Sequence, residues 1–403
     1  MRMSPYGWTM GNSRTLKLNM IVCACFIAIA SSPIAPQTDK GALEVQTSPI
    51  LFYHESSRQQ RIQALLDEFD FDECALRGVS EFEQMLLLRD WVYRRIPYDL
   101  NYKDAELLDA AAILRRAQKG ESFICTSMAV VFVECAVSLG WTARLVFLRK
   151  KSGQEHAAAD IWSNQYRKWI YIDPTWNIHL ERYGVPLSVL EARKEWLAHE
   201  GKQITYVFGA GEHIKRYHTG QLPVSRGDSA IWRYLPLDRT WLEYTFQIGV
   251  VGRNDLLSCA ASGCPLWERV YIIRDRFNRR DREWFLAENG IPVSPRALFH
   301  ELNRVDITIA GGAPDRSGPV LVRLRINGKN TFAPNFMEYL VKVGDGEWEV
   351  AEEEYRWKVR RGRNVLAARI MNRFGIVGPI TKKEIIIHTS GLSKRPSRSS
   401  RVR

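Results

Sequence analysis

An apolar run that follows a single cysteine constrains the fold of this chain more than any other feature. Residues 128–139 are almost entirely apolar, and Gly140 ends the run. A helix that is apolar on nearly all sides is a buried helix, and glycine is a common residue just after a helix end. Cys125 would lie in the first turn, where free N–H groups and the positive end of the helix dipole favour a thiolate.

Two short β-prone runs after this helix predict an antiparallel hairpin. The first begins at His156 (HAAADIW), and the second ends at Asp173 (WIYID), just before a proline. The short connection at 164–167 sets the two runs side by side, and a further strand is expected at 144–149. His156 and Asp173 would then lie close together on neighbouring strands, within reach of the start of the helix.

Cysteine, histidine and aspartate placed in this way are the parts of an activated thiol nucleophile. His156 would take the thiol proton of Cys125, and Asp173 would orient the imidazole and stabilise its charge. The thiolate would attack an amide carbonyl to give a thioester, which water or an amine resolves. The Cys125 N–H is one expected oxyanion donor, and Gln118 is a candidate for the second. A lone residue of any of these types is more often structural, so the hypothesis depends on their combination.

The same stretch resembles the transglutaminase-like superfamily, whose fold is papain-like. The matching residues are Gly120, Cys125, Ala129, the run LGWTAR at 139–144, His156-Ala157, Trp169 and Asp173-Pro174-Thr175. The resemblance covers about residues 60–180 and implies an α+β core of helices on an antiparallel sheet. It also implies a Cys125–His156–Asp173 triad and acyl transfer or hydrolysis at an amide.

Two departures from the family pattern bear on substrate preference. Three alanines and Asp160 follow His156, where the family usually has an aromatic and then an acidic residue. The gap between Gly120 and Cys125 is also longer than usual.

The first 30 residues predict a secretory signal peptide. Basic residues precede an apolar run of about 11 residues, whereas a membrane span needs about 20. Ala28-Ile29-Ala30 fits a cleavage site, and an uncleaved signal anchor is the alternative. The protein is therefore expected to be secreted or to lie in the cell envelope, in the periplasm or outside the cell.

The remaining chain divides by pattern into five segments. They are a flexible lead at 31–56, the catalytic core at 57–200, an accessory or connecting region at 201–302, a β-sandwich at 303–389 and a basic disordered tail at 390–403. The region 201–302 either extends the core or forms a separate unit. Six or seven short strands with turn signals indicate the sandwich. Its late part, residues 362–379, resembles fibronectin type III or immunoglobulin-like modules.

Charge and cysteine content limit the partners. The net charge is +12, and removal of Arg2, Arg14 and Lys17 with residues 1–30 leaves +9. Ordinary solubility charge is the preferred interpretation, an anionic surface is the alternative, and nucleic acid is not expected for an exported protein. Cys259 and Cys264 are close enough in sequence to pair in a loop.

No motif indicates a cofactor, and no spacing indicates a metal site. Four histidines after the hairpin are interpreted as surface or loop residues: His179, His199, His213 and His218.

Three functions are compatible with these patterns. The first is an exported cysteine peptidase or amidase that acts on proteins, peptides or cell-envelope material. The second is an acyltransferase that cross-links amines to glutamine or to cell-wall amides. The third is an adhesion or scaffold protein that keeps the fold without catalysis, and the intact set of Cys125, His156 and Asp173 argues against it.

Overall fold

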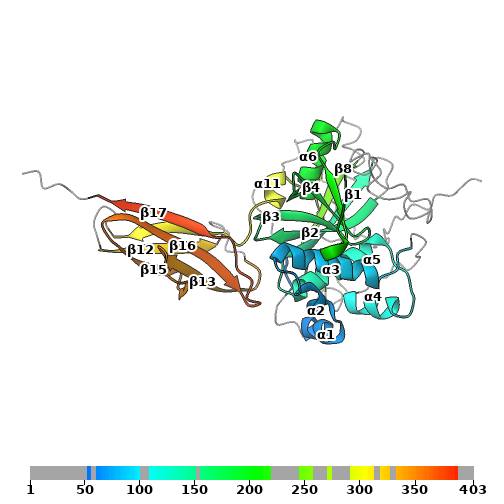
Figure 1. Cartoon of the computed structure of the whole chain (residues 1–403), viewed down its shortest axis with the longest axis horizontal. Coiled ribbons are helices and arrows are strands. Elements are labelled where there is room, and N and C mark those ends of the chain that lie inside the picture. The colour runs from blue at the N-terminus through cyan, green and yellow to red at the C-terminus, as the bar shows by residue number, and fades with distance from the viewer. Residues whose placement is uncertain are drawn as a thin grey trace, which may run out of the picture.

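The computed structural model describes residues 52–55, 60–99, 109–150, 155–218, 245–256, 270–274, 291–312, 318–326 and 333–388. They form a core of helices and a sheet, with a β-sandwich beside it (Figure 1). The predicted signal peptide, the basic tail and the Cys259–Cys264 pair lie outside the described residues. No helix in the described ranges has the length and hydropathy to cross a membrane.

The described part of the core contains seven α-helices, and four of them begin after a capping serine or aspartate. The seven helices are α1 (Gln60–Glu68), α2 (Phe71–Ala75), α3 (Glu81–Arg95), α4 (Ala110–Ala117), α5 (Cys125–Ser138), α6 (Val189–His199) and α11 (Pro295–Leu298). Ser80 caps α3 by accepting a hydrogen bond from the Glu83 N–H at 3.2 Å. The predicted buried helix is α5, and Gly140 follows it with a φ of 86°, in the left-handed region that glycine tolerates.

One curved sheet spans the core. Its strands are β1 (Ala143–Lys150), β2 (Glu155–Ser163), β3 (Lys168–Asp173), β4 (Ile178–Arg182), β5 (Val185–Pro186), β6 (Thr205–Phe208), β7 (Lys215–His218), β8 (Thr245–Val251), β9 (Val270–Arg274) and β10 (Ile291–Pro292). They are ordered β10-β9-β8-β1-β2-β3-β4-β6-β7, with β5 beside β4. The described strands after residue 200 therefore extend the sheet that carries His156 and Asp173, at both of its edges.

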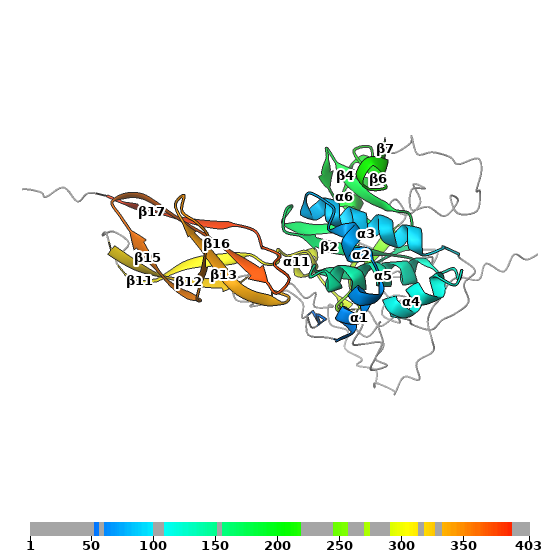
Figure 2. The same cartoon turned by 60° about the horizontal axis from the view of Figure 1, so that its bottom comes forward.

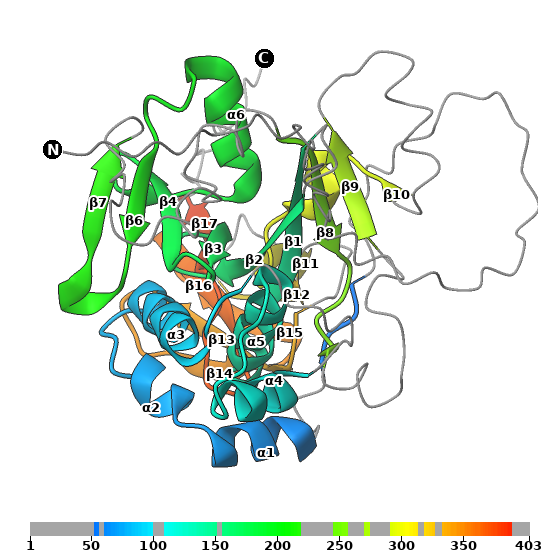
Figure 3. The same cartoon turned by 90° about the vertical axis from the view of Figure 1, so that its right-hand side faces the viewer.

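Two apolar cores lie on the two faces of this sheet. One core joins α1 to α5 with alternate residues of β2, including Ala157 and Ala159. The other core joins α6 and α11 with residues on the opposite face of the sheet, including Ala158 of β2 and Tyr171 of β3. Figure 3 shows the sheet bending between them, with α6 on one side and α3 and α5 on the other.

The C-terminal strands form the β-sandwich that the turn spacing predicts. A three-stranded sheet holds β11 (Val305–Gly311), β12 (Gly318–Ile326) and β15 (Glu354–Val359). A four-stranded sheet holds β14 (Glu349–Ala351), β13 (Phe336–Val343), β16 (Gly362–Asn372) and β17 (Thr381–Ile387), in that order. Trp357 is fully buried between the sheets. The whole is an α+β fold with a C-terminal sandwich, as expected from the sequence.

The sandwich meets the core at the far end of the cysteine-bearing helix. The Asn372 side-chain amide donates a hydrogen bond to the Gly140 carbonyl oxygen at 3.0 Å. A Cβ atom on Gly140 would lie 2.4 Å from the Phe374 ring, so only glycine allows this close approach. The sandwich lies to one side of the helices and the sheet in the view of Figure 2. The sandwich thus rests on α5 at the opposite end from Cys125.

Candidate active site

Cys125 is the first residue of α5, preceded by Ile124 at the N-cap. The helix behind it is buried from Met128 to Ser138, so its position on the sheet is fixed by packing. The cysteine itself is partly exposed, unlike Cys135 on the same helix, which is buried. A rigid helix therefore presents this one thiol at its N-terminal end.

The β2–β3 hairpin brings His156 and Asp173 together. Its register pairs Ala159 with Ile172, so Asp173 comes opposite Ala158, which shares a face with His156. His156 is 4% exposed and Asp173 is fully buried. His156 Nε2 and Asp173 Oδ2 are 2.7 Å apart, a short distance typical of a hydrogen bond to a carboxylate.

The three predicted residues form one chain of contacts. Besides its bond to Asp173, the His156 ring is hydrogen-bonded to the Cys125 thiol. Because Nε2 faces the carboxylate, Nδ1 is the ring nitrogen left for the sulfur. The Ala157 backbone N–H also donates to the Cys125 sulfur. The imidazole thus stands between thiol and carboxylate, the order that a general base requires.

Asp173 receives four hydrogen bonds from its surroundings. Besides His156, the Tyr171 hydroxyl donates to Oδ2 at 3.0 Å. The backbone N–H groups of Thr175 and Trp176 donate to Oδ1 at 3.0 and 3.3 Å. These donors fix the position of the carboxylate beside the His156 ring. Sequence reasoning did not identify Tyr171, although it shares the face of Asp173 two residues earlier on the same strand.

An aromatic pair covers the imidazole. The Trp176 ring stacks on His156 with centroids 6.1 Å apart and planes at 25°. Tyr98 meets Trp176 edge-on at 5.1 Å. These rings exclude water from one face of the His156–Asp173 pair, where a lower dielectric strengthens the ionic contact. Trp176 follows the Asp173-Pro174-Thr175 signature directly, which is the signal that could have identified it.

Opposing effects set the pKa values of the thiol and the imidazole. Burial, the largest influence, raises the pKa of Cys125. The hydrogen bond and charge of His156 outweigh it, and the pKa ends below the ordinary value. Burial lowers the pKa of His156, but the charge and hydrogen bond of Asp173, with the bond to Cys125, raise it to about 10. Both shifts favour a thiolate–imidazolium pair near neutral pH.

Two other residues named from the sequence lie elsewhere. Gln118 is the exposed C-cap residue of α4, and its role as a second oxyanion donor stays a prediction. Asp160 is buried and binds Arg144 at 3.1 Å. The Arg144 guanidinium lies 3.7 Å from the centroid of the Trp169 ring. The acidic residue that follows His156 in this chain is thus part of a buried ion pair.

The interpretation of His179 as a surface or loop residue was wrong. It is fully buried on β4, where its ring contacts Arg89 and Glu181. The apolar alternation of a short strand gave no sign of these partners, because they come from α3 and from the same strand two residues on. His199, His213 and His218 are not buried, in agreement with the prediction.

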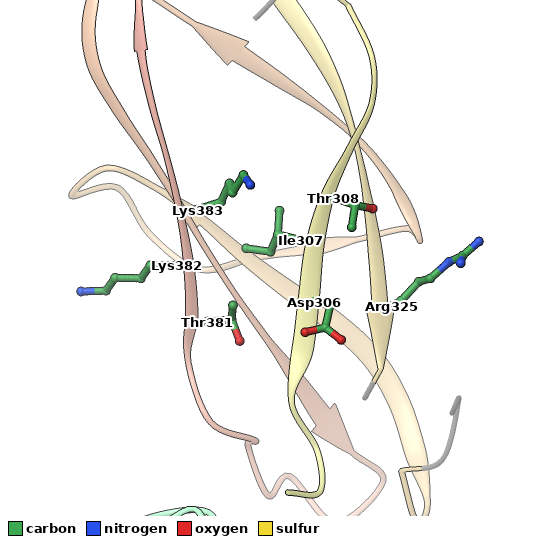
Figure 4. A pocket seen from close by; sticks show the side chains of 7 residues that line it. All are labelled: Asp306, Ile307, Thr308, Arg325, Thr381, Lys382 and Lys383. Atoms are coloured by element: carbon green, nitrogen blue, oxygen red, sulfur yellow. The ribbon is translucent and has the colours of Figure 1, made fainter. Parts of the chain in front are cut away.

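A hollow on the sandwich is separate from this cluster. It has a volume of about 460 Å³ and lies between β11 and β17, with Ile307, Thr381 and Lys383 among its lining residues. Figure 4 shows these side chains around a wide space between two sheet edges. No cysteine or histidine lines it, so the chemistry of a thiol nucleophile belongs to the core.

Comparisons with known proteins agree with the fold of the core. Residues 74–174 match the family model of the transglutaminase-like superfamily, so this part of the chain is a transglutaminase-like domain. No curated protein matches the sequence.

Two solved structures give partial matches. One is a candidate cysteine protease from Cytophaga hutchinsonii, 14% identical over 32% of this chain and 46% of the other, with a TM-score of 0.24. The other is a TGase, 22% identical over 29% of this chain and 31% of the other, with a TM-score of 0.23. The matched part spans less than half the length of either protein.

Proposed function

We propose that the protein is an exported cysteine peptidase or amidase, with Cys125, His156 and Asp173 as its triad. The observation that supports this most is the position of the His156 ring, hydrogen-bonded to Cys125 on one side and 2.7 Å from Asp173 on the other. A structural histidine needs no partly exposed thiol at a helix N-terminus beside it.

The proposed reaction begins with the thiolate–imidazolium pair. The Cys125 sulfur attacks the amide carbonyl carbon, and the carbonyl oxygen takes the negative charge near the N-terminus of α5. His156 then gives its proton to the leaving amine, and the C–N bond breaks to leave a thioester. His156 next accepts a proton from water as the water oxygen attacks the thioester, and the C–S bond breaks to release a carboxylic acid and the Cys125 thiolate beside the imidazolium. Asp173 holds the ring throughout.

The same thioester can also react with an amine to give a new amide and release no acid. The first intermediate is shared, so the resolving nucleophile alone separates hydrolysis from acyl transfer. The Trp176 ring stacked on His156, with Tyr98 packed against Trp176, limits the water near the imidazole, and this favours transfer as the alternative activity.

The sandwich is proposed to be a fibronectin type III-like spacer or binding module. Its described strands form two sheets of order β11-β12-β15 and β14-β13-β16-β17. The fourth strand pairs with the third, whereas in a constant-type immunoglobulin domain the fourth joins the sheet of the first, second and fifth. The proposed site of action is the cell envelope or the exterior, on proteins, peptides or envelope amides, since residues 1–30 have the pattern of a signal peptide.

Alkylation of Cys125 tests the activation step without a known substrate. The purified chain is treated with iodoacetamide at pH 7, and mass spectrometry follows each cysteine-containing peptide. Cys125 is expected to react at least tenfold faster than Cys74, and His156→Ala should remove most of this advantage. Equal rates at both thiols would contradict the proposal.

A substrate panel then tests the chemistry. Peptides, glutamine-containing proteins and cell-wall fragments are incubated with the wild type and with Cys125→Ala. Acid release in water, compared with amide formation in the presence of an added amine, distinguishes the peptidase from the acyltransferase. Equal product from the wild type and Cys125→Ala would show that the sulfur takes no part.

A further inference from the structure

A buried arginine on α3, Arg89, contacts the turn that follows Asp173. The Arg89 side chain has no exposed surface. Its Nε donates to Asn177 Oδ1 at 2.9 Å, and one terminal nitrogen donates to the Gly209 carbonyl oxygen. The other terminal nitrogen lies 2.9 Å from His179 Nδ1. All three ends of the guanidinium are thus engaged, although burial of such a charge is costly without a nearby anion.

Through Asn177, Arg89 holds the turn that carries Asp173. Asn177 lies four residues after Asp173, in the turn just before β4, with a φ of 54°. Its amide nitrogen donates to Asp90 Oδ1 at 2.6 Å while its oxygen accepts from Arg89. Two consecutive residues of α3 therefore clamp one asparagine side chain. This clamp fixes the backbone whose N–H groups bind the Asp173 carboxylate.

His179 cannot balance the charge of Arg89. Its Nδ1 accepts from Arg89, and its Nε2 donates to Glu181 Oε1 at 3.0 Å, which is the neutral tautomer. Burial, chiefly, and the charge of Arg89 lower the pKa of His179 to about 4. Glu181 in turn has Arg216 of β7 at 3.7 Å. The Glu181 carboxylate of β4 therefore also interacts with the Arg216 guanidinium.

The carboxylates that act on Arg89 are Asp90 on its own helix and Asp173 of the triad. Burial lowers the pKa of Arg89 to about 9, and these two anions oppose the decrease, so the guanidinium is charged at neutral pH. The active form of the triad holds a thiolate, an imidazolium and a carboxylate, a net charge of −1 in a mostly buried place. A buried cation nearby offsets that charge.

We propose that Arg89 is a positioning residue that acts through Asp173 as the buried counter-charge of the triad and favours the thiolate form of Cys125. This inference rests on the proposed function. The competing explanation is a structural clamp between α3 and β4, in which the hydrogen bonds matter and the charge does not.

The pH dependence of Cys125 alkylation separates charge from clamping. Loss of a nearby positive charge makes the thiol proton harder to lose, so the alkylation midpoint rises. Arg89→Gln removes the charge and keeps some hydrogen-bond donors, and we expect its midpoint to rise by about half a pH unit or more. Arg89→Lys keeps the charge and loses the fork of donors, and we expect its midpoint to stay near that of the wild type.

Arg144→Gln is the matched control. Arg144 is 1% exposed and also pairs with a buried carboxylate, that of Asp160. Its loss should lower the melting temperature without moving the Cys125 midpoint, because its partners are Asp160 and the Leu298 carbonyl oxygen. All variants are measured as the full chain, with folding checked by circular dichroism.

A midpoint that rises equally in Arg89→Lys and Arg89→Gln would overturn the counter-charge and leave the clamp. If Arg89→Gln does not fold, a raised midpoint in folded Arg89→Lys is enough to overturn the counter-charge. An equal rise in Arg144→Gln would overturn it as well. Failure of the proposed function has a different signature: in the wild type, Cys125 would titrate as an ordinary thiol and His156→Ala would not change it.

Discussion

The core and the sandwich bury polar groups to very different extents. Within the described residues, the core buries charged or polar side chains on α3, α5 and most of the central strands, among them Arg89, Glu134, Arg144, His156, Asp160, Asp173, His179 and Glu181. The described part of the sandwich buries one such residue, Asn372, and its amide points into the core. The interior of the sandwich is otherwise apolar.

Burial of a polar group costs free energy unless every partner is in place. The described interior of the sandwich avoids this cost, because it is held together by close packing and the burial of apolar side chains. The core bears the cost at several places, and the buried groups of His156 with Asp173 and of Arg144 with Asp160 are held in pairs. The difference assigns structural support to one region and reactivity to the other, and each prediction below tests that assignment.

The largest expected effect is on the stability of the sandwich alone. Trp357 is fully buried there, and Trp357→Ala should cost about 3–5 kcal/mol of unfolding free energy through the cavity that it leaves. Calorimetry should show the sandwich transition at a lower temperature. Alkylation of Cys125 at pH 7 should keep its wild-type rate. A loss of Cys125 reactivity in this variant would break the division between the regions.

Phe132→Ala is the control from the core. Phe132 is fully buried on α5, so a cavity there loosens the helix that carries Cys125. This variant should lower the core transition and also slow the alkylation of Cys125, in contrast to Trp357→Ala.

The second effect is electrostatic and is confined to the triad. Burial lowers the pKa of His156, but the charge and hydrogen bond of Asp173, together with those of Cys125, raise it to about 10. Asp173→Asn keeps the shape and removes the charge, so the His156 pKa should fall and the imidazolium should be lost at lower pH. The Cys125 thiolate then loses its partner, and alkylation at pH 7 should slow by about tenfold. NMR titration of the His156 ring gives the shift directly, and an unchanged titration would contradict this account.

A smaller effect is expected from the hydroxyl of Tyr171. It donates to Asp173 Oδ2 at 3.0 Å, the same oxygen that binds His156. Tyr171→Phe removes one of four donors to the carboxylate. It should remove about 1 kcal/mol of the free energy that holds Asp173 in its orientation, and the alkylation of Cys125 should become several-fold slower. Tyr206→Phe is the control, because Tyr206 is buried against the same sheet face without a hydrogen bond to Asp173. Equal effects in both variants would assign the change to packing alone.

The fold could be predicted where local chemistry decides it. The apolar run after Cys125 and the short connection at 164–167 each act over a few residues, so α5 and the β2–β3 hairpin follow from the sequence. The relation between His156 and Asp173 follows too, because alternation along paired strands sets which side chains share a face.

The surroundings of the triad could not be predicted, since they depend on packing between distant segments. Arg89 and His179 are 90 positions apart and meet only when α3 crosses β4. The sequence left open whether residues 201–302 extend the core or form a separate unit, because nothing local shows that β8 pairs with β1. Asn372 was not identified either, because its partner is the carbonyl oxygen of Gly140, 232 positions away.

The smallest expected effect tests whether a buried charge of the core can be unrelated to the triad. Glu134 lies nine positions after Cys125 on α5, where its carboxylate accepts from the Ala110 N–H at 2.7 Å. Burial, and then the charges of Asp109 and Glu55, raise the pKa of Glu134 well above its ordinary value, against the Ala110 N–H and Arg61. The folded state thus holds this proton more tightly than the unfolded chain, in which a glutamate titrates at about 4.3.

The sign of the pH effect follows from this difference. As pH rises above the unfolded value and through the raised folded value, the unfolded chain loses the proton first and the fold loses stability. Glu134→Gln removes that loss, so its melting temperature should exceed the wild-type value by a few degrees at pH 8 and approach it near pH 4. Glu200→Gln, at an exposed position, should show no such trend. The alkylation midpoint of Cys125 should not move in Glu134→Gln, and a shift there would mean that the charges of the core act as one coupled set around the triad.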